Sequence, residues 1–119
     1  MIKLYQEILT ERPHNSEASG IPLGFYLSSN AFFTSCFAHI IPKSGHYTMV
    51  IKSKEAKEKL LRYNKDNIML VTPEEHSLID HGTEEKRAKY ELKHNCSFDV
   101  FFKKREELFE SIKAKIDEI

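Results

Sequence analysis

Long apolar segments are missing from the sequence of 119 residues, and this limits the classes of protein that it can represent. No run approaches the ~18 consecutive apolar residues of a membrane-spanning helix. The N-terminal segment MIKLYQEILTERP has no apolar core followed by small residues, so it does not resemble a signal peptide. Internal repeats and low-complexity segments are also lacking. We therefore expect one cytoplasmic domain over residues 1–119, large enough to bury a core.

Cysteine is scarce, and the two that occur, Cys36 and Cys96, are far apart in the sequence. They form no Cys-x-x-Cys pair, which excludes a four-cysteine zinc knuckle. We expect both to be reduced, partly buried thiols.

The chain has no net charge, with 18 basic and 18 acidic residues, which argues against a protein that coats nucleic acid through bulk charge. The charge is nevertheless uneven. Residues 38–65 contain seven Lys or Arg and two Glu. This local excess suits contact with a polyanion, and it suits equally well the solvated face of a helix.

The pattern of residues predicts an α+β domain. Helices are expected over residues 2–11, 53–63 and, with an aromatic face, about 97–119, and short strands over 31–41 and 67–72. The turn-rich segment 14–24 predicts a tight hairpin or knuckle-like loop. The aromatic face of the last helix is expected to be core, or a homodimer surface if it is not fully covered.

The sharpest local signal is the segment Thr72-Pro73-Glu74-Glu75. A threonine cap, proline at the first helical position and glutamate three residues after the cap together predict a capping box. The helix that it opens, PEEHSLIDH, is expected to end at Gly82.

Four polar residues of the middle of the chain suggest chemistry. His39 ends the first expected strand, Asn67 opens the second, and His76 lies in the capped helix. Asp80 follows His76 by four residues and therefore shares its helix face. A histidine and an aspartate in this relation can bind one divalent cation together.

The segments AHIIPKS, DNIMLVTPEEH and HSLID resemble the HNH endonucleases, also called ββα-metal or His-Me finger nucleases. The likeness is greatest to small bacterial and phage proteins with a "SHILPKG…YP…NI.L.T.EEH" pattern, and it covers roughly residues 5–90, because a segment like RPHNSEASGIPLG also precedes their core. The resemblance implies a ββα-metal core over about residues 31–82, flanked by the N-terminal and C-terminal helices, and an enzyme that hydrolyses DNA phosphodiester bonds.

By this resemblance His39 is the general base, its ring oriented by a backbone carbonyl, and Asn67 holds the loop between the strands. His76 binds one divalent metal, most simply Mg²⁺, with Mn²⁺ or Zn²⁺ as alternatives. Imidazole suits proton removal near neutral pH, and a divalent cation stabilises the phosphorane and the leaving oxygen. Contacts with DNA are expected from the side chains of Lys43, His46, Lys52 and Lys54.

The sequence departs from the family pattern at three places. Many members carry a metal ligand immediately before the base, where this chain has Ala38; Asp80 could replace it, a water-rich site with few protein ligands could suffice, or the site could be inactive. The loop of residues 14–24 has no cysteine, so a metal-free loop is expected. A charged helix separates the two strands. The alternative function is an inactive nucleic-acid-binding or structural module with the same fold.

Overall fold

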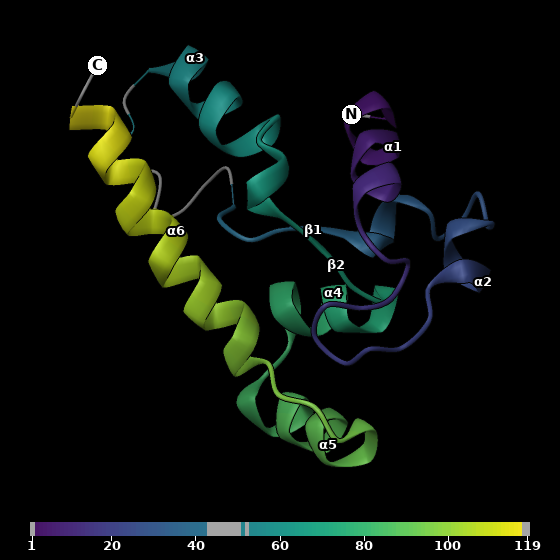
Figure 1. Ribbon diagram of the computed structural model, residues 1–119. Coiled ribbons are helices and arrows are strands. Elements are labelled where there is room, and N and C mark those ends of the chain that lie inside the picture. Colours follow the sequence, from purple (N-terminus) through teal and green to yellow (C-terminus); the bar gives the residue numbers. More distant parts are fainter. Residues whose placement is uncertain (1, 43–50, 52, 118–119) are drawn as a thin grey trace.

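Two short antiparallel strands lie at the centre of the molecule, with helices around them (Figure 1). The computed structural model describes residues 2–42, 51 and 53–117. Strand β1 (Phe37–His39) pairs with strand β2 (Ile68–Leu70). The register places Phe37 opposite Leu70, Ala38 opposite Met69 and His39 opposite Ile68. This mixture of helices and a two-stranded sheet confirms the expected α+β class.

The helical segments of the described residues differ in length. In chain order they are α1 (Ile2–Glu11), α2 (Gly24–Leu27), the 3-10 turn η1 (Thr34–Cys36), α3 (Lys54–Lys57), the π-helical turn η3 (Glu58–Arg62), the 3-10 turn η4 (Lys65–Asn67), α4 (Pro73–His81), α5 (Glu84–His94) and α6 (Asp99–Asp117). The predicted helix over residues 2–11 is confirmed.

Helix α1 is attached to the strand ribbon through charged side chains. The guanidinium of Arg12 donates to the backbone carbonyls of Ile68 at 2.6 Å and Lys65 at 2.7 Å. The ammonium of Lys65 in turn pairs with Glu11 at 2.8 Å and Glu7 at 3.4 Å. Because guanidinium bonds to partly buried carbonyls are charge-assisted, Arg12 fixes the end of α1 against the start of β2.

The loop over residues 14–24 is the tight hairpin-like turn that the sequence predicts. An antiparallel bridge joins Asn15 to Pro22, and Gly20 adopts a left-handed φ of 81°, which glycine tolerates without strain. The loop also extends the edge of the sheet. The Glu17 backbone amide donates to the Leu70 carbonyl, and the Leu70 amide donates to the Glu17 carboxylate at 2.7 Å.

The predicted strand over residues 31–41 is wrong in its first half. Residues 31–36 form turns and η1, with bonds from Phe33 to Ser29 and from Cys36 to Phe33, and only Phe37–His39 is strand. The aromatic residues that suggest a strand are used in packing, since the rings of Phe33 and Phe37 lie 5.3 Å apart. Tertiary packing here overrides strand propensity.

Two other predictions need adjustment of their bounds. Strand β2 is shorter than the predicted 67–72, because Asn67 belongs to a 3-10 turn. The predicted helix over 53–63 exists as α3 continued by η3, and the Ser53 side chain accepts from the Ala56 amide as an N-cap. A π-helical turn of this kind marks a local distortion in a helix.

Helix α4 has the predicted capping box. The Thr72 side chain accepts from the Glu75 amide, and the Glu75 carboxylate accepts from the Thr72 amide at 2.8 Å. The helix ends at Gly82, which has a φ of −78° instead of the left-handed value expected of a terminal glycine. Glycine is still required, because a Cβ atom there would lie 2.4 Å from the carbonyl oxygen of Leu78.

Helix α5 is an element that the sequence analysis did not assign. It is capped by Thr83, and it ends at Asn95, whose φ of 51° is left-handed. Helix α6 then begins at Asp99, close to the predicted start. Phe98, which precedes it, and Phe101 and Ile112 within it are buried in the chain's own core, as expected of the aromatic face, whose other members Phe102 and Phe109 are partly buried. Dimerisation through this helix stays a prediction.

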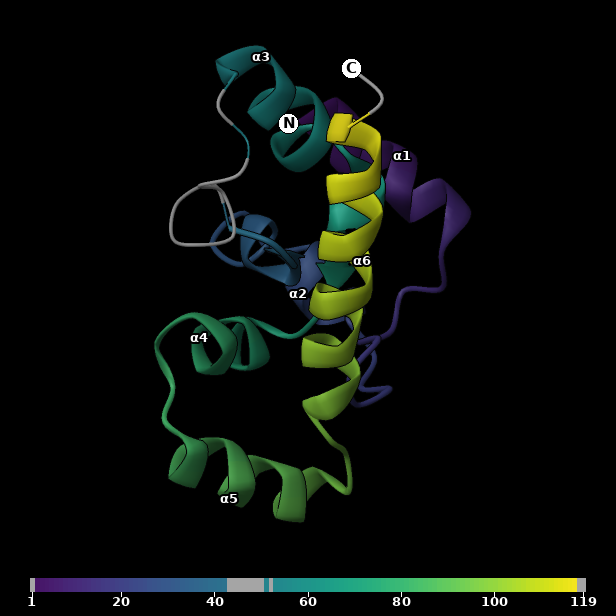
Figure 2. The same ribbon diagram turned by 90° about the vertical axis from the view of Figure 1, so that its left-hand side faces the viewer.

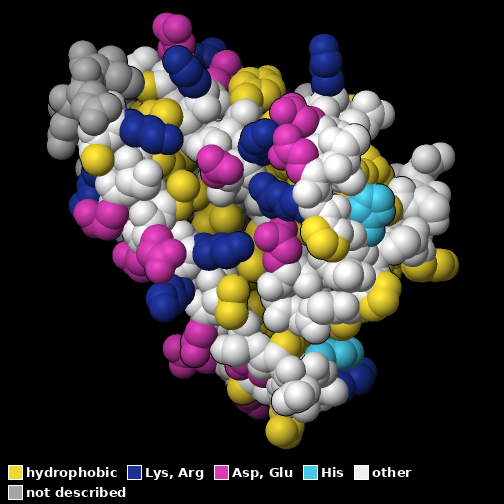
Figure 3. Space-filling view, in the orientation of Figure 1, with side chains coloured by type: hydrophobic (Ala, Val, Ile, Leu, Met, Phe, Trp, Pro, Cys, Tyr) yellow, Lys and Arg dark blue, Asp and Glu magenta, His cyan; other side chains and the backbone are white. Residues whose placement is uncertain are grey.

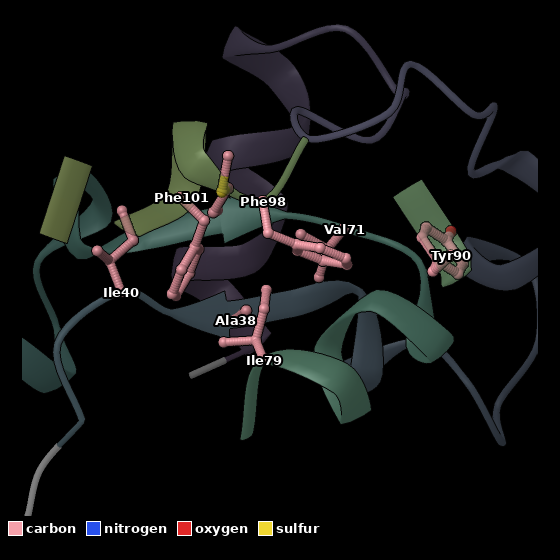
Figure 4. Close-up of a cluster of buried hydrophobic side chains, with 8 residues drawn as sticks. Ala38, Ile40, Val71, Ile79, Tyr90, Phe98 and Phe101 are labelled. Atoms are coloured by element: carbon pink, nitrogen blue, oxygen red, sulfur yellow. The ribbon is translucent and has the colours of Figure 1, made fainter. Parts of the chain in front are cut away.

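The strand ribbon separates two hydrophobic clusters by the alternation of its side chains. Ala38, Ile40, Met69 and Val71 face α4, α5 and α6, whose contributions include Ile79, Tyr90, Phe98 and Phe101 (Figure 4). Phe37, Ile68 and Leu70 face α1, which contributes Tyr5 and Ile8. The rings of Tyr5 and Phe37 stack at 4.0 Å. A third cluster joins η3 to α6.

Candidate functional site

The side chain of Asn67 ties together three segments at the end of the ribbon. It is fully buried, its Oδ1 accepts from the Ile41 amide at 2.8 Å, and its Nδ2 donates to the carbonyls of Ile41 and Leu61, each at 3.0 Å. These bonds pair the backbone amide and carbonyl of Ile41, just after β1, and link this segment to η3. The fully buried side chain therefore shapes the end of the ribbon, and a part for Asn67 in catalysis stays a prediction.

His76 is held by both of its ring nitrogens. Nδ1 lies 2.9 Å from the backbone carbonyl of Ser35, which precedes β1, and Nε2 lies 3.0 Å from Oδ2 of Asp80. The imidazole is partly buried and the carboxylate is exposed. The predicted sharing of one helix face by His76 and Asp80 therefore brings the two side chains into direct contact.

Proton counting restricts the state of the His76 ring. A carbonyl oxygen can only accept, so Nδ1 must carry a proton. An ionised Asp80 carboxylate can only accept. In a neutral ring whose proton is on Nδ1, Nε2 carries a lone pair and therefore also can only accept. Two acceptors then face each other unless a second proton or a metal cation lies between them. A histidine whose Nδ1–H is bonded to a backbone carbonyl is also the usual arrangement behind a metal ligand.

The separation of the two groups suits one octahedral ion. Ligands in neighbouring positions at about 2.1 Å from Mg²⁺ lie about 3.0 Å apart, the distance between Nε2 and Oδ2. Within the described ranges, no group of three or more His, Cys, Asp or Glu side chains is gathered that could hold a metal. A cation at His76 and Asp80 would thus take its other ligands from water and substrate, which suits Mg²⁺.

His39 lies at the opposite end of β1 from the Ser35 carbonyl that holds His76. Its Nε2 is 3.3 Å from the backbone carbonyl of Arg62, the last residue of η3. An orienting carbonyl for this ring was expected, and its source, 23 residues along the chain, could not be read from the sequence. Side-chain alternation along β1 puts His39 on the other face of the ribbon from Ala38.

Ala38 itself is a core residue. It is fully buried in the cluster that includes Ile79 of α4 and Phe101 of α6 (Figure 4). A carboxylate or imidazole at this position would be desolvated among apolar side chains. Alanine at this position is consistent with the way this chain packs α4 on its ribbon.

The predicted DNA contacts fall largely outside the described residues. Lys43, His46 and Lys52 lie there, and Lys54, at the start of α3, is exposed. Of the other cations of this basic stretch, Lys65 is paired with α1, and Arg62 lies 3.9 Å from Glu58 and 5.2 Å from the centre of the Tyr63 ring. The basic stretch is therefore partly neutralised by its own neighbours.

A cleft of about 480 Å³ opens beside the ribbon and is of mixed charge. Its walls carry Arg12, Glu17, Asp66, Lys104 and Glu107, over Ile40, Ile68 and Leu108. Figure 3 shows basic and acidic side chains alternating across the centre of this side of the molecule, with hydrophobic side chains between them. Such alternation gives no strong attraction for a polyanion.

A buried polar network beneath α4 was only partly foreseen. The Glu75 carboxylate, fully buried, accepts from Ser16 Oγ at 2.5 Å and from the Tyr90 hydroxyl at 2.9 Å, in addition to its capping bond. Burial, together with the hydrogen bond to Glu75, raises the pKa of Tyr90 above its ordinary value. The capping signal identifies Glu75, whereas Ser16 and Tyr90 could be assigned only from the fold.

Comparisons with models of known protein families, with curated proteins and with solved structures find no match for this chain. In the part of the chain that the structure describes, no helix is both long enough and apolar enough to cross a membrane.

Proposed function

We propose that the chain is a metal-dependent endonuclease of the HNH type that hydrolyses DNA phosphodiester bonds. The sequence resemblance motivates this assignment. Two features of the fold support it: an antiparallel ribbon followed directly by a capped helix gives the ββα order of the family, and the buried Asn67 fastens the end of the ribbon.

The observation that carries the proposal is the pair formed by His76 and Asp80. Nδ1 of His76 is anchored on the Ser35 carbonyl, so that Nε2 points at the Asp80 carboxylate 3.0 Å away. These two atoms would hold one divalent cation. When bound, the cation supplies charge stabilisation to the phosphorane and to the leaving 3′ oxygen.

His39 has the role of general base in this proposal, which requires the attacking water to lie between His39 and a cation held by His76 and Asp80 near the other end of β1. Its Nε2 lies 3.3 Å from the Arg62 carbonyl, which can only accept, so this nitrogen carries the proton of a neutral ring. In this proposal the imidazole removes a proton from the attacking water, and the contact with Arg62 keeps the ring in its orientation. A base placed in this way contributes roughly 10²–10⁴-fold to the rate.

Nicking of supercoiled plasmid in Mg²⁺ or Mn²⁺ tests the assignment. We expect nicking by the wild type, its loss in EDTA, and a fall of roughly 10²–10⁴-fold in His39→Ala. His14→Ala is the control, because His14 is an exposed histidine in the loop of residues 14–24 and not on α4. Equal nicking by the wild type and His39→Ala would contradict the catalytic role.

Metal binding gives a readout that does not depend on activity. Calorimetric titration with Mn²⁺ should show one site that is lost in His76→Ala and weakened in Asp80→Asn, with Asp99→Asn, an exposed aspartate elsewhere, unchanged. Binding of Mn²⁺ that is the same in all four proteins would place the metal elsewhere.

The second candidate function is an inactive nucleic-acid-binding module with this fold. It is favoured by the same contact, because a protonated His76 and Asp80 at 3.0 Å form a complete ion pair without a metal. DNA binding without Mn²⁺ uptake or nicking would support this candidate over the nuclease.

A further inference from the structure

A row of three lysines lines a cleft between α4 and α5. The cleft has a volume of about 280 Å³ and is lined by Glu74, Leu78, Lys86, Lys89, Tyr90 and Lys93. The two helices lie next to each other at one end of the molecule, in both Figure 1 and Figure 2. None of these lysines belongs to the basic stretch of residues 38–65.

Three lysines of α5 share one side of the helix. Lys86, Lys89 and Lys93 follow one another at spacings of three and four residues, which places them on one side of the helix. Two other charged side chains of α5 are used within the fold, since Arg87 donates to the carbonyls of Leu78 and Gly82 and Glu91 accepts from the Phe98 amide. The three lysines of the row, by contrast, are exposed on the surface.

The acidic residues near the row do not neutralise it. Glu85 lies 3.5 Å from Lys89, but both side chains are about four-fifths exposed, and such surface pairs contribute little and are easily exchanged. Glu74 is the carboxylate among the residues that line the cleft, against three ammonium groups. Among the charged residues that line the cleft, three ammonium groups therefore outnumber one carboxylate.

The spacing of the row fits a phosphate backbone. Lys86 to Lys93 spans about 10 Å along α5 at about 1.5 Å per residue. Because a DNA strand winds around its axis, its successive phosphates lie farther apart than the axial rise of about 3.4 Å, and the long lysine side chains let a row of this length reach about two to three of them.

The position of the row relates it to the candidate site. On α4, at about 100° per residue, Glu74 and Leu78 lie on one flank and His76 and Asp80 on the other. Between the two flanks lies the outer face of the helix, where Ser77 and His81 are exposed. A duplex lying across this face could contact the lysine row while a phosphodiester reaches His76 and Asp80.

We propose that Lys86, Lys89 and Lys93 form a binding surface for the phosphate backbone of duplex DNA. The surface holds DNA across the outer face of α4. The assignment of DNA as the ligand rests on the proposed function, but binding at this surface does not require that the chain cut DNA.

The experiment measures binding of a labelled duplex by fluorescence anisotropy in EDTA, over a range of salt concentrations. Replacing the three lysines together by Gln should reduce the slope of log K against log salt by about 2 to 3, at about 0.9 per phosphate contact. The control replaces Lys3, Lys103 and Lys115 by Gln, three exposed lysines elsewhere with the same change of net charge. The control should lose much less of the slope.

The outcomes separate this proposal from the nuclease assignment. Equal slopes for the two triple variants, or no DNA binding by the wild type, would overturn the lysine surface. A reduced slope in a protein that never nicks plasmid would support the surface and contradict the nuclease. If polyglutamate binding, and not DNA binding, depended on the three lysines, the surface would belong to an acidic protein partner.

Discussion

Cys36 shows how burial alone sets the chemistry of one residue. The thiol is fully buried beside the ribbon, and its Sγ lies 3.5 Å from the Phe32 carbonyl. Burial raises the pKa of the thiol from 9.0 to about 11. A thiol that ionises so late is a poor nucleophile and metal ligand at neutral pH, so Cys36 is a structural residue, as the sequence indicated.

The raised pKa of Cys36 makes stability depend on alkaline pH. The thiol is protonated in both states below pH 9; above it, the unfolded chain loses the proton while the folded chain keeps it up to about pH 11. The free energy of unfolding should therefore fall as pH rises between these values, by about 2–3 kcal/mol from this group. Urea unfolding at several pH values, compared with Cys36→Ala, measures the contribution. Parallel pH curves for the two proteins would refute it.

Asn67 illustrates which part of a residue's role a sequence can show. An asparagine before an apolar strand predicts a polar side chain that bonds to the neighbouring loop, and it does bond to Ile41. Its third bond, to the Leu61 carbonyl, depends on where η3 packs. The spacing of His76 and Asp80 is local and was predictable, whereas the Ser35 carbonyl that orients His76 comes from 41 residues away.

At the scale of elements, local signals predicted α4 well and α5 poorly. The capping box is written in consecutive residues, so it defines the start of α4 without tertiary information. Helix α5 has a single buried residue, Tyr90, and therefore almost no hydrophobic period to detect. The predicted strand over residues 31–41 failed because its aromatic side chains pack on α1 and its backbone forms turns.

The network around Glu75 joins three elements, so its loss should be costly. Glu75→Ala leaves the Ser16 hydroxyl, the Tyr90 hydroxyl and the Thr72 amide without their buried acceptor. We expect a loss of about 3–5 kcal/mol in the free energy of unfolding, measured in urea. Glu74→Ala, at the exposed neighbouring position, should change stability by less than about 0.5 kcal/mol. Similar losses in the two variants would show that the network contributes little.

At the scale of the molecule, α6 connects parts of the core that the ribbon alone does not join. Phe98 and Phe101 pack on the ribbon face that α4 and α5 share, and Ile112 packs in the cluster with η3. The Arg105 guanidinium donates to the Ile40 carbonyl at 2.7 Å and lies over the Phe101 ring. The aromatic face predicted a core helix, but its partners at both ends of the ribbon required the fold.

Phe101 tests whether α6 and the ribbon unfold as one unit. Its side chain is fully buried, so Phe101→Ala should lower the free energy of unfolding by about 3–5 kcal/mol. Val100→Ala, half exposed on the same helix, should cost under about 0.5 kcal/mol. Helix α6 contributes to the cluster shared with α4 and α5 and to the cluster with η3. Far-ultraviolet circular dichroism and tyrosine fluorescence should therefore report one coincident transition in urea. Separate transitions in Phe101→Ala would mean that α6 detaches while the ribbon and α1 stay folded.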